Sequence, residues 1–148
     1  MIGLLQRVSS ASVSVNNESI ASIAGGLLVL IGVERGDTET EAQRLAERLL
    51  NYRVFGDAAG KMNFSLRDTG GELLLVPQFT LAADTSSGNR PGFSTAAEPT
   101  RGKELFDCLV EAARLQHRKV QTGRFGADMK VSLCNEGPVT LNLRVRPG

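Results

Sequence analysis

The sequence predicts one α+β domain over residues 1–148, in which a mostly antiparallel or mixed β-sheet carries two main helices. Three observations lead to this fold class. A length of 148 residues suits a single domain. Apolar residues make up 41% and charged residues 22% of the chain, the balance of an ordinary globular protein. Strand-like segments outnumber helix-like ones, and they follow one another without a repeated strand–helix–strand unit.

The N-terminal segments predict a hairpin followed by a buried strand. Residues 6–15 alternate small or apolar with polar side chains, which is the two-residue period of a half-buried strand. The polar residues 16–19 favour a turn, and residues 20–23 return as the hairpin partner. Residues 27–33 form a nearly continuous apolar run, which indicates a strand covered on both faces.

Two segments show helical periodicity. Thr38 is a candidate N-cap and Glu41 its capping-box partner three residues on, so we expect a helix over residues 39–51. Its apolar side chains recur at helical spacing, which predicts one buried face. A second helix is expected from residue 98 or 100 to about residue 118, again with apolar side chains on one face.

The rest of the chain predicts short strands, turns and one long loop. Residues 84–99 are rich in Ser, Gly and Pro, and such a loop inside a compact domain is usually functional. Turn residues occupy 56–60. Further strands are predicted at 52–55, 73–76, 120–122, 129–135 and 139–145.

The net charge of +1 does not indicate a strongly basic nucleic-acid binder. The charges are nevertheless uneven, because residues 1–100 hold 8 Lys and Arg against 11 Asp and Glu, whereas residues 101–148 hold 9 against 5. A basic face from this last third could contact phosphates, with Lys119, Arg124 and Lys130 as candidates. A solvated surface without a partner is the alternative.

The chain is expected to be cytoplasmic. No apolar run reaches the roughly 18 residues that a membrane-spanning helix needs. Arg7 interrupts the short apolar stretch at the N-terminus, which is untypical of a secretory signal. Cys108 and Cys134 are then expected to be reduced and buried, in the manner of small apolar residues.

The sequence holds little of the usual hydrolytic machinery. His117 is the only histidine, so any Ser-His-Asp triad would have to use it. Its neighbours Arg118 and Lys119 disfavour an imidazolium, and a contact with the C-terminus of its own helix is the simpler expectation. The two cysteines are too few and too isolated for a zinc cage. We expect neither a metal nor a cofactor.

Two segments are unusual enough to be candidate sites. Pro77 directly follows the predicted strand 73–76 and cannot donate to a ladder, so the sheet is expected to have an edge or a bulge there. The backbone N–H groups that follow could then face a ligand. In residues 135–140, Gly137-Pro138 is either a plain turn or a cis bond in a defined loop.

These two segments are part of a resemblance that covers nearly the whole chain. The matching motifs are Met1–Val8, Gly26–Val33, Gly60–Asn63, Gln78–Leu81, Arg90–Pro91, Thr122–Phe125 and Asn135–Thr140. With these motifs the sequence resembles the D-aminoacyl-tRNA deacylases of bacteria and eukaryotes, the D-tyrosyl-tRNA deacylase family. Pro77 stands where the family normally has a serine, so a hydrogen bond from that hydroxyl is missing here.

The resemblance implies a barrel-like form of the sheet and a hydrolytic activity. The family cleaves the ester between a D-amino acid, or glycine, and the terminal adenosine of tRNA, which is a proofreading step in translation. Its members are homodimers with active sites at the subunit interface, and they need no metal. The implied partners are aminoacylated tRNA and a second copy of the chain, with neither DNA nor membrane.

The same resemblance implies roles for individual residues. Gln78, Phe79 and Thr80 form the candidate catalytic segment, in which the N–H groups of Phe79 and Thr80 would stabilise an oxyanion. The Gly137–Pro138 bond is expected to be cis and inserted into the partner's site, where its carbonyls reject an L side chain. Arg7 is expected to orient this loop by hydrogen bonding.

Two questions stay open on the sequence alone. Either the 2′-hydroxyl of the substrate's ribose assists the attack of water, or Thr80 is the nucleophile. Without a neighbouring base a threonine hydroxyl is poorly activated, which favours the first route. The chain could also be a non-catalytic tRNA-binding or small-molecule-binding protein of the same fold, and turnover of D-Tyr-tRNA separates these functions.

Overall fold

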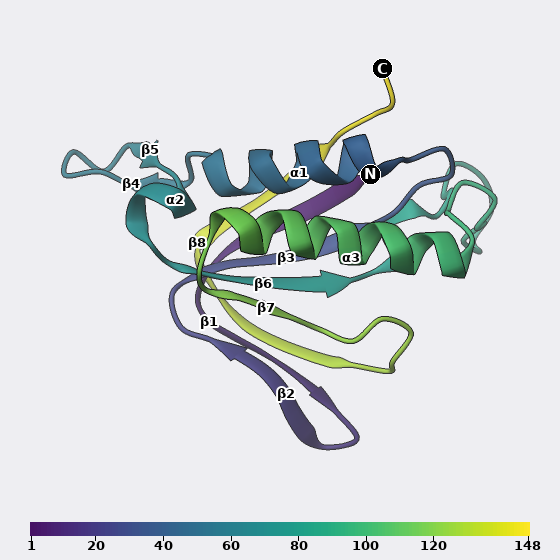
Figure 1. Cartoon of the computed structure of the whole chain (residues 1–148). Helices are drawn as coiled ribbons and strands as arrows, with labels where there is room; N and C mark the ends of the chain where they lie inside the picture. Colours follow the sequence, from purple (N-terminus) through teal and green to yellow (C-terminus); the bar gives the residue numbers. More distant parts are fainter.

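The computed structural model describes residues 1–148, and the fold is organised around one long, bent strand (Figure 1). This strand, β1 (Ile2–Val15), has three antiparallel neighbours, which are β2 (Glu18–Ile23), β3 (Gly26–Gly32) and β8 (Lys130–Arg144). The first half of β1 lies between β3 and β8, and its second half lies between β2 and β8. The chain can make this switch because β1 bends.

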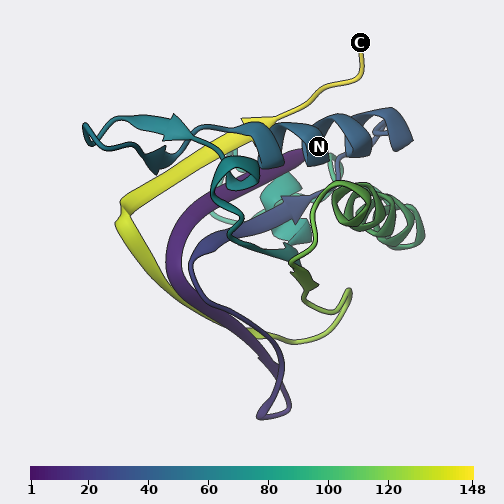
Figure 2. The ribbon, with the colours of Figure 1, turned by 60° about the vertical axis from the view of Figure 1, so that its left-hand side comes forward.

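Beyond β3 the sheet continues with parallel strands. β6 (Glu72–Pro77) pairs with β3, and β7 (Val120–Thr122) pairs with β6. The side chain of Gln121 then links β7 back to β2, since it accepts from the Ser22 N–H at 2.8 Å and donates to the Ser22 carbonyl at 2.7 Å. Figure 2 shows the strands curling into an open barrel. The predicted mixed, barrel-like sheet is confirmed.

The two predicted helices lie side by side on one face of the sheet (Figure 1). α1 (Glu39–Asn51) has the predicted bounds, and the carboxylate of Glu41 accepts from the Thr38 N–H at 2.6 Å, as the capping box requires. α3 (Pro99–Gln116) begins with proline at its first turn, where no N–H is needed. None of the helices combines the length and the apolar composition needed to cross a membrane.

Short elements between these were not predicted. A hairpin of β4 (Phe55–Gly56) and β5 (Met62–Phe64) replaces the strand expected at 52–55, and its turn is where turn residues were expected. α2 (Leu66–Thr69) and a 3-10 helix, η1 (Phe79–Ala82), were missed. A helix of one turn is too short to show a hydrophobic period, so the sequence carries no signal for it.

The parallel strands are covered on both faces, as the apolar run predicted. Leu27 and Val29 of β3 belong to the core beneath α1 and α3, together with Leu73 of β6. Leu28 and Leu74 point the other way, into a second core inside the barrel. Successive side chains of a strand alternate between faces, so a strand with a core on each side has no polar position.

Three expectations were wrong. The predicted strands 129–135 and 139–145 are one strand, β8, because both halves pair with the continuous β1. Cys134 is exposed, because β8 is an edge strand that turns this side chain outward, and Cys108 is half-buried. Burial raises the pKa of the Cys108 thiol. His117 contacts the carbonyl of Gly71, at 2.6 Å from its Nε2, rather than the end of its own helix.

Gly26→Ala is expected to destabilise the fold by about 3 kcal/mol, in the range of severe overpacking. A Cβ at this position would lie 1.9 Å from the carbonyl oxygen of Glu72, so β3 and β6 would have to separate. Urea denaturation measures the loss. Gly25→Ala is the matched control, because its Cβ would meet only the Val8 carbonyl oxygen, at 3.9 Å. Equal stability of the two variants would contradict this account of the strand spacing.

Candidate functional site

The carboxyl ends of the parallel strands open towards the N-terminus of α3, and this edge of a sheet is where ligands commonly bind. β6 ends at Pro77, in register with Ile31 of β3. Leu73 N–H donates to the Lys119 carbonyl next to β7, and Gln78 N–H donates to Ile31 on the β3 side. Because backbone N–H groups alternate between the two sides of a strand, the nitrogen of Pro77 faces the β7 side. The pairing of β6 with β7 has already ended there, two residues earlier at Leu75. The predicted edge at Pro77 is confirmed.

η1 turns the chain directly after Pro77 and presents backbone donors at this edge. Leu81 N–H donates to the Gln78 carbonyl at 3.2 Å, which closes the first turn. As the first residues of that turn, Phe79 and Thr80 have N–H groups without an acceptor inside it. Adjacent unpaired N–H groups are the arrangement that stabilises a developing oxyanion. The candidate catalytic segment thus has donors of the kind that ester hydrolysis needs.

The Thr80 hydroxyl has no base beside it. Its hydrogen-bonded side-chain partner is the amide of Gln78, whose Nε2 donates to Thr80 Oγ1. His117 lies at the other end of β6, next to Gly71. Six residues separate Gly71 from Pro77, which is about 20 Å along a strand. The structure therefore leaves the hydroxyl of Thr80 unactivated.

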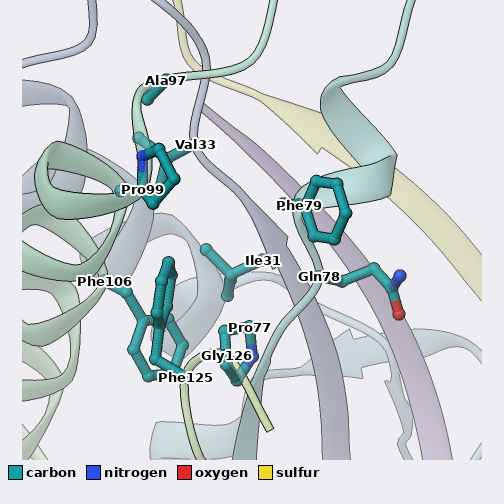
Figure 3. Close-up of a pocket in the computed structure, with 11 residues that line it drawn as sticks. Ile31, Val33, Pro77, Gln78, Phe79, Ala97, Pro99, Phe106, Phe125 and Gly126 are labelled. Carbon is teal, nitrogen blue, oxygen red and sulfur yellow. The ribbon is translucent and has the colours of Figure 1, made fainter. Parts of the chain in front are cut away.

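An apolar pocket of about 250 Å³ lies beside η1 (Figure 3). The Phe106 and Phe125 rings form part of its wall, with centroids 6.5 Å apart, and Phe79 lies on the opposite side. No charged side chain lines it. The lining residues are Ile31, Val33, Pro77, Gln78, Phe79, Ala97, Pro99, Gly102, Phe106, Phe125 and Gly126. Such walls suit a flat ring system better than an ion.

Sequence reasoning missed this pocket because four separate parts of the chain build it. β3, β6, the N-terminus of α3 and the loop after β7 each contribute to the lining. Of the two rings in the wall, Phe106 looked like an ordinary residue of the buried helix face, and Phe125 lay at the end of the Thr122–Phe125 motif. In the whole chain, no three His, Cys, Asp or Glu side chains come together as a metal site would require.

The second candidate segment lies at the bend of β8. The Gly137–Pro138 peptide bond is cis, as expected, and both residues are exposed. Asn135 braces the bend, since its Oδ1 accepts from the Val139 N–H and its Nδ2 donates to Thr140 Oγ1, each at 2.8 Å. Gly137 has a φ of 137°, and a Cβ there would lie 2.8 Å from Val139 Cγ2. This position accommodates only glycine.

Arg7 ties the bend of β8 to the rest of the fold. Its Nε donates to the Glu136 carbonyl at 2.9 Å, and its Nη1 donates to the Val54 carbonyl at 2.6 Å. A Cβ on Gly137 would lie 3.1 Å from Arg7 Nη2, so the guanidinium packs directly against the glycine. The side chain is half-buried, and its rigid fork holds two backbone segments at once.

The two candidate segments lie far apart within one chain. Gly137 lies opposite Arg7 of β1. Arg7 pairs with Leu27 of β3, and Leu27 pairs in turn with Leu73 of β6. Pro77 is four residues further along β6, about 13 Å, and β8 is three strand spacings from β6, about 14 Å. Measured along the curled sheet, the two segments are roughly 20 Å apart, which is larger than an aminoacyl group. One copy of the chain does not bring both segments to one ester.

The three basic candidates are exposed, but they do not form one cluster. Arg124 follows β7 and adjoins Phe125 in the pocket wall. Lys119 precedes β7, at the opposite end of that strand. Lys130 begins β8, where it pairs with Ser14 near the turn between β1 and β2. Arg124 is therefore the one of the three that lies next to the pocket.

Comparisons with known proteins identify the family of the chain. A protein-family model described as D-Tyr-tRNA(Tyr) deacylase matches residues 4–144. The D-aminoacyl-tRNA deacylase of Xanthomonas axonopodis pv. citri (strain 306) is 63% identical over 145 residues, which cover 97% of this chain and 99% of that protein. The protein of the same name from Thioalkalivibrio sulfidiphilus (strain HL-EbGR7) is 61% identical over 147 residues, 99% of each chain.

Two solved structures have the same fold. One is described as c-Myc DNA Unwinding Element Binding Protein, with a TM-score of 0.95 and 37% identity over 99% of this chain and 100% of that one. The other is described as a probable eukaryotic D-amino acid tRNA deacylase, with a TM-score of 0.80 and 17% identity over 96% and 98%. At that identity the second likeness concerns the fold alone.

The structure is that of a small single-domain α+β protein with a barrel-like mixed sheet, in which an apolar pocket lies beside the turn of η1. Among proteins of that kind the match over residues 4–144 and the identities of 61% and 63% are decisive. The chain belongs to the D-Tyr-tRNA(Tyr) deacylase family, which is a family of enzymes.

Proposed function

We propose that the chain hydrolyses D-aminoacyl-tRNA, and tRNA mischarged with glycine, to free amino acid and tRNA. The observation that carries this proposal is the pair of free N–H groups, on Phe79 and Thr80, beside an apolar pocket. The relatives, which are D-aminoacyl-tRNA deacylases by name, support the same reaction. Such an enzyme removes D-amino acids from tRNA in the cytoplasm, where the freed tRNA returns to translation.

The pocket takes the terminal adenine, and the ester then lies over η1. A water oxygen attacks the ester carbonyl carbon, and the N–H groups of Phe79 and Thr80 stabilise the negative charge that develops on the carbonyl oxygen. The bond between this carbon and the ribose oxygen breaks, and the proton from water passes to that ribose oxygen. The products are a free carboxylic acid and a tRNA with an intact ribose.

The vicinal 2′-hydroxyl of the substrate orients the attacking water, and Thr80 is not the nucleophile. This part of the proposal rests on the surroundings of Thr80, whose hydrogen-bonded partner is an amide donor with no capacity to accept a proton. The side chains of the segment position the backbone, and the chemistry needs neither cofactor nor metal from the protein.

A second copy of the chain completes each site. The Gly137–Pro138 segment of the partner forms a wall beside the α-carbon of the substrate, and its carbonyls leave no room for an L side chain. Hydrogen or a D side chain passes, so exclusion alone gives the selectivity. The separation of roughly 20 Å within one chain supports this homodimer, because the wall reaches the donors only from another subunit. Arg7 holds the wall in place.

The proposal is tested by turnover of purified chain with D-Tyr-tRNA and L-Tyr-tRNA. We expect release of D-tyrosine over many turnovers and no release of L-tyrosine. Thr80→Ala is expected to keep kcat within about tenfold, because the hydroxyl is not activated. Binding of both tRNAs without turnover would instead favour a tRNA-binding protein. Complete loss of hydrolysis in Thr80→Ala, with the fold and RNA binding intact, would make Thr80 the nucleophile.

Phe79→Pro is expected to lower kcat by about 10²–10³, the usual effect of removing one oxyanion donor. Proline lacks the N–H, and the first position of a helical turn tolerates it. Phe79→Ala is the matched control, because it removes the ring but keeps the N–H, and its kcat should stay within about tenfold of the wild type. Steady-state kinetics with D-Tyr-tRNA measures both. Equal kcat values for the two variants would count against the backbone donor.

Mixing two inactive variants tests whether the site is shared between subunits. Phe79→Pro lacks the donor, and Gly137→Ala is expected to be inactive because a Cβ that meets Val139 and Arg7 pushes the Gly137–Pro138 segment into the space of the substrate. Random exchange makes half of the dimers mixed, and each mixed dimer has one site with an intact donor and an intact wall. We therefore expect about a quarter of wild-type activity on mixing. A chain with both substitutions, mixed with Phe79→Pro, is the control and should restore nothing. No recovery in the test mixture would contradict the shared site.

A further inference from the structure

Two large aromatic rings are exposed side by side outside the pocket. The side chain of Phe79 is 59% exposed and that of Phe93 is 42% exposed. Their ring centroids are 5.2 Å apart, with an angle of 48° between the planes. Phe79 lines the pocket, and Phe93 is its neighbour outside the lining. Exposed apolar surface that continues from a pocket indicates a binding surface.

The loop that carries Phe93 is held to the element that carries Phe79. Asp84 and Gly92 exchange two backbone hydrogen bonds of 2.8 and 2.9 Å, which close the loop at its base. Thr95 Oγ1 donates to the carbonyl of Ala82 in η1 at 2.5 Å. Hydrogen bonds from Ser86 also lower the pKa of Asp84, whose carboxylate accepts from the Ser86 N–H at 2.9 Å. The backbone segments that carry the two rings are therefore tied together before anything binds.

A cation accompanies the rings. Arg90 is exposed, lies three residues before Phe93 and forms no ion pair. Together with Asp84 it is one of two charged residues between 83 and 97. Aromatic rings with an unpaired arginine in the same loop are a means by which proteins bind single-stranded nucleic acid, since the rings stack on bases and the arginine contacts phosphate. A single arginine in the loop is too little positive charge to attract a folded acidic protein, so a nucleic acid is the partner that these residues favour.

We propose that Phe93, with the outer face of Phe79, stacks on the base immediately 5′ of the terminal adenosine, and that Arg90 contacts the phosphate between these two nucleotides. This inference rests on the proposed function, which puts the terminal adenine in the pocket. The order of the nucleotides follows from the order of pocket, Phe79 and Phe93. The base must belong to an unpaired 3′ end, because a base inside a duplex has no free face to stack on a side chain.

A binding cycle tests this stacking without any catalysis. The probe is an unacylated RNA hairpin that ends in an unpaired CCA, compared with the same hairpin lacking the base of the penultimate nucleotide. Wild-type protein should bind the abasic hairpin about tenfold more weakly, since one stacked base contributes an effect of this size. Phe93→Leu should bind the intact hairpin about tenfold more weakly than wild type and lose nothing further on the abasic one. Phe93→Tyr keeps the ring and should behave as wild type.

The matched control is Phe64→Leu. Phe64 is 45% exposed on the β4–β5 hairpin, so it reports on nonspecific contact between RNA and an exposed ring. It should show the same tenfold preference for the intact hairpin as wild type. The thermal midpoint of each variant checks that the fold is kept.

An equal preference for the intact hairpin in wild type and Phe93→Leu would overturn the inference. If Phe93→Leu also converts dimers to monomers in light scattering while that preference is unchanged, the rings belong to a contact between copies of the chain and the inference is wrong. Release of D-tyrosine is measured separately and decides the proposed function. Active enzyme without the stacking effect refutes this inference alone, and the stacking effect in an inactive protein refutes the proposed function alone.

Discussion

The parallel pairing of β3 with β6 is the constraint on which the rest of the structure depends. β3 is apolar along its whole length and β6 from Leu73 to Pro77, so both of their faces must be covered. α1 and α3 cover one face, and the curled hairpin of β1 and β2 covers the other. Gly26 lets the two strands approach closely where they begin, beside Glu72. The same pairing makes both strands end at one edge, and the pocket forms there.

The chemistry at this edge comes from the backbone more than from side chains. Pro77 ends the ladder on one side, η1 follows at once, and the first N–H groups of the turn are left without partners. The segment that we propose as the wall against L side chains is also backbone, held by Arg7 and Asn135 around a glycine. In the proposed mechanism these backbone groups contact what all aminoacyl esters share, so one site would serve many amino acids.

Recognition of RNA in this scheme depends on ring systems rather than on overall charge. The net charge is +1, and the basic candidates of the last third of the chain are spread along the molecule. In the proposed scheme a pocket for one base and an aromatic pair for the next supply stacking without counterion release, and the phosphate contact of Arg90 adds the part of the affinity that depends on salt. Such a protein reads the free 3′ end, which every tRNA has, and needs few contacts with the helical body.

The sequence by itself determined the local features of this protein. The capping box and period of α1, the doubly covered β3 and the edge at Pro77 all follow from residue order, because propensity and periodicity record the surroundings of nearby residues. Only the tertiary structure decided that β8 is one strand, that Cys134 faces outward, and that four segments enclose the pocket. It also placed Phe93 against Phe79 and Gly137 far from Pro77. These features depend on strand register and on pairing between distant segments, and no local pattern in the chain encodes them.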